Sequence, residues 1–365
     1  MWKYNKGEWS ELYTFVYLLN KAKLYSADEH LQINENDYFP LIQIIREEEQ
    51  GKPIYYVTGD PVKIYQKGIL SKEVNREDLE AMAARLLKYI PKGSRAFEIP
   101  GAEEFFNSIC CNKAKAQSNK KEDITVELRD INTGIKAIRG FSIKSFLGSA
   151  PTLINPGTNT NFTFILENCN DQIMTDTNGI ETSQKIKDRI KHLLESGCSF
   201  IPEKHSISKQ FEENLIFIDT LMPDLLQLLV LYHYIEDLTN VSDVVKKLEE
   251  KNPLGYSNVK VYAYKIKKLL CAWALGLTPE RSDWEGIEDA NGGYITVRPD
   301  GEIACYHLYN RAEFENYLFN YSRFDRASTS RFGYLKVYKE NGLYKIKLNL
   351  QIRFRLPAAK GATNG

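Results

Sequence analysis

The sequence lacks the patterns that mark disulfide frameworks and zinc sites. Its six cysteines include no C-x-x-C pair, and its five histidines are not spaced as metal ligands. These absences favour reduced thiols, as in cytosolic proteins, over a disulfide-bonded secreted domain.

Long apolar runs are also lacking. No segment holds 18 or more consecutive apolar residues, and the amino terminus, M-W-K-Y-N-K, has no apolar stretch of the kind found in signal peptides. We therefore expect a cytoplasmic protein that has no membrane partner.

An excess of either charge is the third missing feature. Lys and Arg number 48 and Asp and Glu number 48, so the formal net charge is zero. No global basic field indicates a nucleic-acid partner, and any such binding site must be a local patch.

The sequence does contain a mixture of helical and extended patterns over 365 residues. Their order predicts a mixed α/β protein with a central mixed sheet flanked by helices, a helical middle and a mixed β-rich C-terminal region. The expected divisions are residues 1–175, 176–280 and 281–365. Within them, residues 215–238 are expected to form one helix and residues 344–354 one strand.

The stretch from Asp123 to Lys144 has the pattern of a β-hairpin. Polar and apolar residues alternate strictly along 124–128, and residues 130–134, D-I-N-T-G, have the composition of a turn. With the turn centred there, Asp123 pairs with Ser142, and Asp123, Ser142 and Lys144 share one face of the hairpin. The other face is covered by Ile124, Phe141 and Ile143, with Ile124 opposite Phe141.

A carboxylate and a lysine on neighbouring strand ends suit metal-assisted hydrolysis of a phosphodiester. Asp123 is the candidate ligand for Mg²⁺, which prefers oxygen ligands, and Lys144 would stabilise charge at the phosphate or orient the attacking water. The arrangement resembles the PD-(D/E)XK nuclease core, although Ser142 stands where that core has its second acid. The alternative is an ordinary hairpin with a charged, solvated outer face.

The first predicted helix, which opens at Gly7 and runs to about Lys23, offers candidates for a second metal ligand. Glu11, together with Glu8, continues the apolar face of this helix, so at least one acid is directed toward the core and could reach the hairpin. Glu127 is a further candidate. The alternative is a helix whose first turn simply carries favourable acids.

A loop near the C-terminus gathers arginines and hydroxyl side chains. Residues 323–331, R-F-D-R-A-S-T-S-R, could contact phosphates or reach guanine in a major groove. Such residues are equally common on exposed loops. The candidates for DNA contact are Arg323, Arg326, Ser328, Thr329 and Arg331, followed by His307, Tyr309 and Asn310.

Several longer runs together resemble a known family. The sequence is similar to the HpaII-type restriction endonucleases in N-K-G-E-W-S-E at 5–11, G-F-S-I-K-S-F-L-G-S-A-P-T-L at 140–153, G-G-Y-I-T-V-R-P-D-G-E-I-A-C-Y-H-L-Y-N-R at 292–311, F-E-N-Y-L-F-N at 314–320, S-T-S-R at 328–331 and I-K-L-N-L-Q-I-R-F at 346–354.

The resemblance implies a type II site-specific endonuclease that uses Mg²⁺ to cut double-stranded DNA, at CCGG in the family as a whole, leaving 5′-phosphate and 3′-hydroxyl ends. A methyltransferase would be its genomic partner, and a homodimer would match a palindromic target. Carried onto this chain, the nuclease motif falls on Asp123, Ser142 and Lys144, with Glu11 as the preferred source of the missing carboxylate.

Two other classes of protein remain compatible with the sequence. Because Ser142 replaces an acid, the chain could be a DNA-binding protein without catalysis. It could also be an interaction protein that uses the apolar segment 221–232. Binding to DNA without cleavage would favour the first, and no affinity for DNA at low salt would favour the second.

Overall fold

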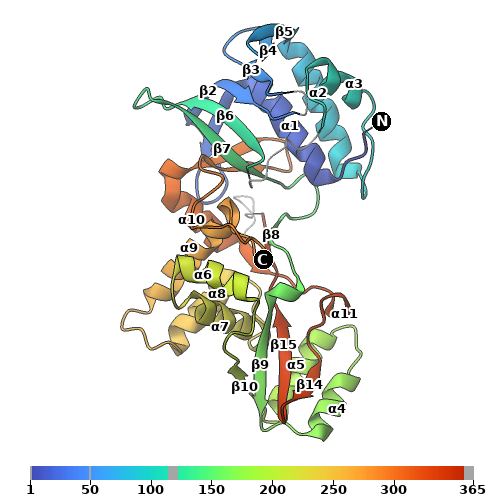
Figure 1. Ribbon diagram of the computed structural model, residues 1–365, viewed down its shortest axis with the longest axis vertical. Coiled ribbons are helices and arrows are strands. Elements are labelled where there is room, and N and C mark those ends of the chain that lie inside the picture. The colour runs from blue at the N-terminus through green and yellow to red at the C-terminus, as the bar shows by residue number, and fades with distance from the viewer. Residues whose placement is uncertain (1, 49–50, 114–121, 357–365) are drawn as a thin grey trace, which may run out of the picture.

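The computed structural model describes residues 2–48, 51–113 and 122–356. Two lobes lie one above the other in Figure 1, the upper one built on a large sheet and the lower one on helices with a smaller sheet. The predicted mixed α/β class is confirmed. The sheets contain strands from both ends of the chain. The division of the chain at residues 175 and 280 stays a prediction.

The large sheet of the upper lobe is mostly antiparallel. It has two parallel pairs, β1 (Lys23–Ala27) with β12 (Ile303–His307) and β7 (Lys136–Ser145) with β11 (Gly293–Val297). Strands β11 and β12 come from beyond residue 290, whereas the other strands of this sheet lie within the first 145 residues. In spatial order its strands are β1 (Lys23–Ala27), β12 (Ile303–His307), β11 (Gly293–Val297), β7 (Lys136–Ser145), β6 (Ile124–Arg129), β2 (Ile33–Ile45), β3 (Ile54–Tyr56), β4 (Val62–Gln66) and β5 (Ile69–Val74).

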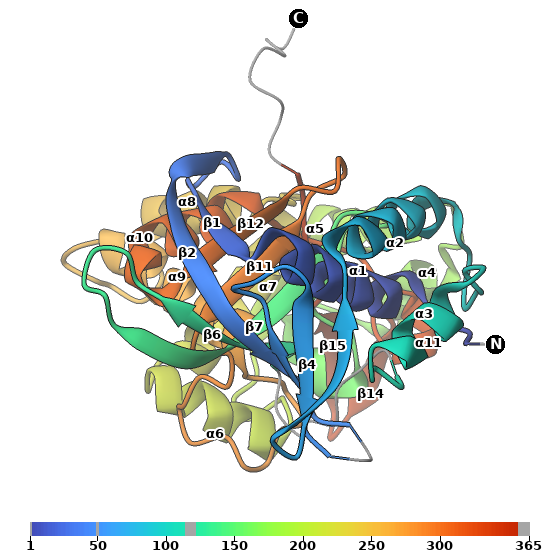
Figure 2. The ribbon, with the colours of Figure 1, turned by 90° about the horizontal axis from the view of Figure 1, so that it is seen from above.

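Helix α1 (Lys6–Lys21) packs across one face of this sheet, and α2 (Arg76–Tyr89) packs against α1 (Figure 2). Asn5 and Glu8 form a reciprocal capping box that starts α1, and Ala22 ends it in the left-handed conformation. The apolar side of α1 is buried against β-strand residues, so this contact forms the core of the upper lobe. The smaller helical pieces here are η1 (Ile90–Lys92) and α3 (Ala102–Ser108).

The lower lobe has its own large core, which extends to the opposite face of the sheet. Alternation along β11 places Ile295 in the core with α1 and Tyr294 in the core of the lower lobe. Its helices are α4 (Asp171–Gly179), α5 (Lys185–Glu195), α6 (Lys209–Ile218), α7 (Met222–Ile235), α8 (Val241–Lys251), α9 (Lys260–Leu275), α10 (Arg311–Tyr321) and α11 (Thr329–Phe332), with η2 (Thr158–Thr160) and η3 (Leu308–Asn310).

Two small sheets complete the lower lobe and the junction between the lobes. The four-stranded sheet has the order β10 (Ser199–Pro202), β9 (Asn161–Glu167), β15 (Leu343–Asn349) and β14 (Val337–Glu340). The three-stranded sheet has the order β13 (Ser322–Phe324), β16 (Ile352–Phe354) and β8 (Thr152–Ile154). Strands from residues 152–167 therefore pair with strands from residues 343–354.

Two predicted elements are wrong in extent. The single helix expected at 215–238 is two helices, α6 and α7, because the chain turns at 219–221 and Pro223 stands in the first turn of α7. The single strand expected at 344–354 divides into β15 and β16, which join different sheets. In the described part of the chain, no single helix is long and apolar enough to span a membrane; α6 and α7 pass that test only as a pair bent by 106°.

Candidate active site

The predicted hairpin forms with the predicted register. Strands β6 and β7 are antiparallel, and Ile124 pairs with Phe141. The turn is fixed by Asp130, whose carboxylate accepts hydrogen bonds from the backbone amides of Asn132 and Thr133 at 2.8 and 2.9 Å. The sequence of the turn and the alternation along the strands therefore agree on one register.

Asp123 lies immediately before β6 and is held against β7. Its Oδ2 accepts a hydrogen bond from the backbone amide of Ile143 at 2.7 Å and another from Ser142 Oγ at 3.3 Å. Ser142, which stands where the predicted nuclease motif would have its second acid, is here a hydrogen-bond donor to Asp123. The two bonds fix one carboxylate oxygen and so orient the other.

The two faces of the hairpin differ as predicted. Ile124, Phe141 and Ile143 are buried in the core that contains α1. Ser142 pairs in register with Tyr294, which belongs to the core of the lower lobe, so both residues point to the opposite face.

Lys144 and Glu11 line a common pocket of about 400 Å³ at the carboxyl end of β7. Helix α1 supplies Glu11, and β7 supplies Lys144, so the contact of α1 with the sheet brings the two residues together. The other lining residues are Asn5, Lys6, Gly7, Ser10, Ile143, Ser145, Gly148, Ser149, Pro151 and Thr152. Asp123 adjoins this pocket through its bond to Ile143.

The two other proposed carboxylates are placed differently. Glu8 accepts a hydrogen bond from the amide of Asn5 at 2.8 Å and thus belongs to the cap of α1. Glu127 lies within β6, where it pairs with Ile138, four residues along the strand from Asp123. Glu11 is therefore the one of these three acids that the fold brings into the pocket of Lys144.

Glu122 is a carboxylate that the sequence reasoning missed. Its side chain lies on Gly140 of β7 so closely that a Cβ atom at position 140 would be 1.9 Å from Glu122 Oε2. Gly140 and Ser142 are two residues apart in one strand and share a face, so Glu122 lies on the face of Ser142. The alternating pattern that revealed the hairpin ends at Asp123 and gave no sign of this contact.

The donor chemistry fits a magnesium ion. No group of three or more His, Cys, Asp or Glu side chains arranged to hold a metal occurs among the described residues. Magnesium, however, keeps several waters and needs only one or two protein carboxylates together with phosphate oxygens of the substrate. Asp123, with one oxygen held by β7, is suited to such a role, and Glu11 and Glu122 are the candidates for a second carboxylate.

The predicted DNA-contact residues of the C-terminal loop lie in the lower lobe, on β13, on α11 and between them. Arg323 and Arg331 are exposed. Arg326 binds Asp237 at 2.6 Å, and Ser328 caps α11 by accepting from the amide of Arg331. Thr329 lines a separate pocket. The fold brings these residues together but does not bring them to the pocket of Lys144.

His307, the looser candidate for DNA contact, is buried. It is 3% exposed, and its ring stacks on Phe39 with a centroid separation of 4.6 Å. Its Nδ1 accepts from the amide of Tyr309 at 3.2 Å, so this nitrogen carries no proton. The side chain is therefore covered by protein in this structure, and its contact with DNA stays a prediction. Tyr309, by contrast, is 62% exposed, and Asn310 is partly exposed at the start of α10.

Burial makes His307 a source of acid sensitivity. Desolvation, followed by the charge of Arg139, lowers its pKa from 6.5 to about 4. As the pH falls, His307 is therefore protonated in the unfolded chain before it is protonated in the folded protein. Its contribution to the free energy of unfolding is complete above pH 6.5 and declines as the pH falls from 6.5 toward 4. We expect a loss on the order of 1 to 2 kcal/mol between pH 7 and pH 5 from this residue.

The measurement is urea unfolding of the wild type and of His307→Phe at pH 7 and pH 5. The variant keeps a ring for the contact with Phe39 and removes the titrating group. Its stability should fall less on acidification than that of the wild type. Equal losses in the two proteins would show that folding does not lower the pKa of His307.

Comparisons with known proteins cover nearly the whole chain. A family model described as HpaII restriction endonuclease matches residues 5–354. The chain is 36% identical over 359 residues to the type II restriction enzyme HpaII of Haemophilus parainfluenzae, a match that covers 96% of this chain and 98% of that enzyme. No solved structure matches the chain.

Proposed function

The chain belongs to the HpaII restriction endonuclease family, and from this membership we propose that it cuts both strands of DNA at a short sequence in a magnesium-dependent reaction. The proposed site is supported by the hydrogen bonds that join Asp123 to Ser142 and to the amide of Ile143, because Ile143 lines one pocket with Lys144 and Glu11.

Each side chain has a distinct part in this proposal. Asp123, helped by Glu11 or Glu122, would hold a magnesium ion, which when bound supplies charge stabilisation at the phosphate and a more acidic water. Lys144 orients the attacking water and stabilises the negative charge that develops on the phosphate oxygens. Ser142 and the amide of Ile143 keep the Asp123 carboxylate in one orientation. Attack in line with the leaving 3′-oxygen gives a 5′-phosphate and a 3′-hydroxyl.

The proposal also covers the target sequence, the DNA contacts, the oligomeric state and the genomic partner. The target is a short site such as CCGG, the exposed residues of the 323–331 loop contact DNA, and two copies of the chain act on a palindromic site as a homodimer. A methyltransferase encoded nearby would protect the host genome. The enzyme would act in the cytoplasm.

Digestion of unmethylated phage DNA by the purified protein tests the function. With Mg²⁺ we expect discrete fragments whose sequenced ends share one short motif, and with EDTA in place of Mg²⁺ we expect intact DNA. Chelation removes the proposed ion without altering the protein, and cutting should return when Mg²⁺ is added in excess. Sequence-specific binding without cutting under all metals tested would instead favour an inactive DNA-binding protein, the alternative that Ser142 suggests.

A further inference from the structure

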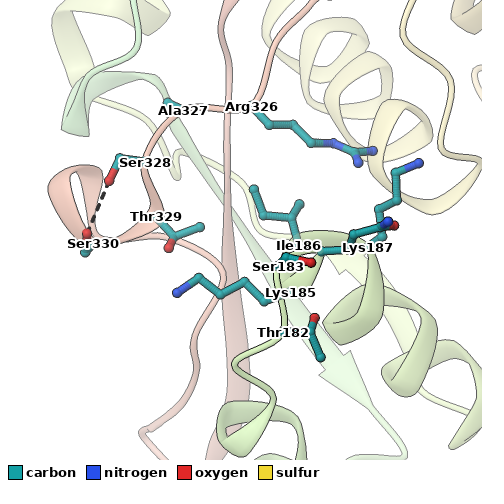
Figure 3. A pocket seen from close by; sticks show the side chains of 11 residues that line it. Thr182, Ser183, Lys185, Ile186, Lys187, Arg326, Ala327, Ser328, Thr329 and Ser330 are labelled. Carbon is teal, nitrogen blue, oxygen red and sulfur yellow. Dashed lines mark hydrogen bonds between the residues drawn. The ribbon is translucent and has the colours of Figure 1, made fainter.

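A pocket of about 570 Å³ lies in the lower lobe (Figure 3), and it shares no lining residue with the pocket of Lys144. One wall consists of residues 182–187, at the start of α5, and the other of residues 326–330, which lead into α11. Figure 3 shows Lys185 extending toward the wall that carries Thr329, and an adjoining pocket is lined by Lys185, Thr329 and Ser330 as well.

Among the residues that the structure describes, the lining is rich in groups that bind anions and contains no carboxylate. Lys185, Lys187 and Arg326 supply positive charge. Five residues that carry hydroxyl groups also line the pocket: Thr182, Ser183, Ser328, Thr329 and Ser330. In a chain whose net charge is zero, a pocket with three cations and no acid in its wall is a local basic patch of the kind that phosphate binding requires.

The carboxylates that neutralise these cations lie outside the lining. Lys185 pairs with Glu181 at 2.8 Å, and that carboxylate is 61% exposed. Lys187 and Arg326 share Asp237, which is 46% exposed. The Lys187–Asp237 pair is exposed on both sides, at 49% and 46%, and such surface pairs contribute about 0 to 1 kcal/mol, so a phosphate can compete for Lys187 at modest cost. Glu181 also binds the buried Arg189 and so stays in place.

Arg326 is a fixed charge in this arrangement. Its side chain is 17% exposed, and its guanidinium lies 5.6 Å from the ring centroid of Tyr234 while binding Asp237. A guanidinium held in this way supplies charge to the pocket but is not free to extend into a groove and form the paired hydrogen bonds that read guanine. The pocket is therefore suited to phosphate and not to base edges.

We propose that this pocket binds backbone phosphates of duplex DNA and so positions the DNA without reading its sequence. The inference rests on the proposed function and adds the α5 wall, with Lys185 and Lys187, to the DNA-binding surface. Both views place α11 on the same side of the molecule as the N-terminal end of α1, next to which the pocket of Lys144 lies (Figures 1 and 2). One duplex could therefore contact both lobes.

The test measures binding of a fluorescent cognate duplex and a non-cognate duplex to protein that carries Lys144→Ala, so that the DNA stays intact. Adding Lys185→Glu should weaken binding to both duplexes about tenfold or more and leave their ratio unchanged. The slope of log affinity against log salt should fall by about 1 for each phosphate that the variant no longer binds. Ser330→Asp, on the opposite wall, should act in the same direction.

Lys191→Glu is the matched control. Lys191 lies on the same helix and forms the same kind of i,i+4 pair, with Glu195 at 3.7 Å, but does not line the pocket. If Lys185→Glu and Ser330→Asp both bind like Lys191→Glu while the parent protein binds DNA, the inference is wrong and the proposed function stands. A change in the cognate to non-cognate ratio would show base reading and overturn the phosphate assignment. If the parent protein binds neither duplex, both proposals fail.

Discussion

Replacing Lys144 with alanine is expected to lower the rate of DNA cleavage by on the order of 10²- to 10³-fold, the loss found when one group that stabilises transition-state charge is removed. Lys144 lies near the end of β7, where it pairs in register with Thr296 of β11, and it lines the pocket with Glu11. Its position is thus set by the sheet and not by a flexible loop. Single-turnover cleavage of a cognate duplex at saturating protein measures this loss apart from binding.

Lys136→Ala is the matched control because Lys136 is an exposed lysine at the opposite end of the same strand. Its cleavage rate should stay within about twofold of the wild type, since it lies about eight residues, or roughly 26 Å, from Lys144 along β7. Ser142→Ala should lose less than Lys144→Ala, about fivefold, because the amide of Ile143 still holds Asp123 when a hydrogen bond of about 1 kcal/mol is removed. Equal rates for Lys144→Ala and Lys136→Ala would exclude Lys144 from the reaction.

Glu48→Gln is expected to lower the free energy of unfolding by about 3 to 5 kcal/mol, the usual cost of leaving a buried charge without its partner. Glu48 and Arg46 form an ion pair at 3.0 Å in which the side chains are 1% and 4% exposed. Arg46 also donates to the carbonyl of Lys113 at 2.9 Å, and Glu48 accepts from the amide of Asn112 at 3.3 Å. The pair therefore ties the chain after β2 to the segment that follows α3.

Urea unfolding measures this cost, and a neighbouring pair provides the control. Glu47 pairs with Lys52 on the surface, where their side chains are 49% and 67% exposed, so Glu47→Gln should cost less than about 1 kcal/mol. The double variant Arg46→Met with Glu48→Leu should recover much of the stability lost in Glu48→Gln, because it removes both buried charges. Similar losses of stability in Glu48→Gln and Glu47→Gln would show that burial of the Arg46–Glu48 pair does not increase the cost of breaking it.

Local patterns were enough to predict the hairpin and its register. The strict alternation at 124–128 and the turn composition at 130–134 both act within about twenty residues, and the observed pairing of Ile124 with Phe141 agrees with them. The helix that carries Glu11 was likewise predicted from its apolar spacing. These are the parts of the candidate site whose geometry depends on near neighbours in the chain.

Contacts between distant segments could not be predicted in this way. The pairing of β7 with β11 depends on tertiary packing, because nothing in either strand specifies a parallel partner. All five residues of β12 are buried, so alternation could not show that His307 points inward. The contact of Glu122 with Gly140 is a close approach that only the folded backbone reveals. The start of α7 is different, since Pro223 was a visible signal for a helix boundary.

Strand β11 is synthesised long after β7, and this delay determines when the sheet around Lys144 can be completed. A ribosome must add roughly 150 residues after Ser145 before Gly293 is made, which takes on the order of 10 to 30 s at about 5 to 20 residues per second. Throughout that interval the nascent chain contains Asp123 and Lys144 but not the strand that flanks Lys144. Nuclease activity should thus appear only after β11 has been made, and fragments released before that point should not cut DNA.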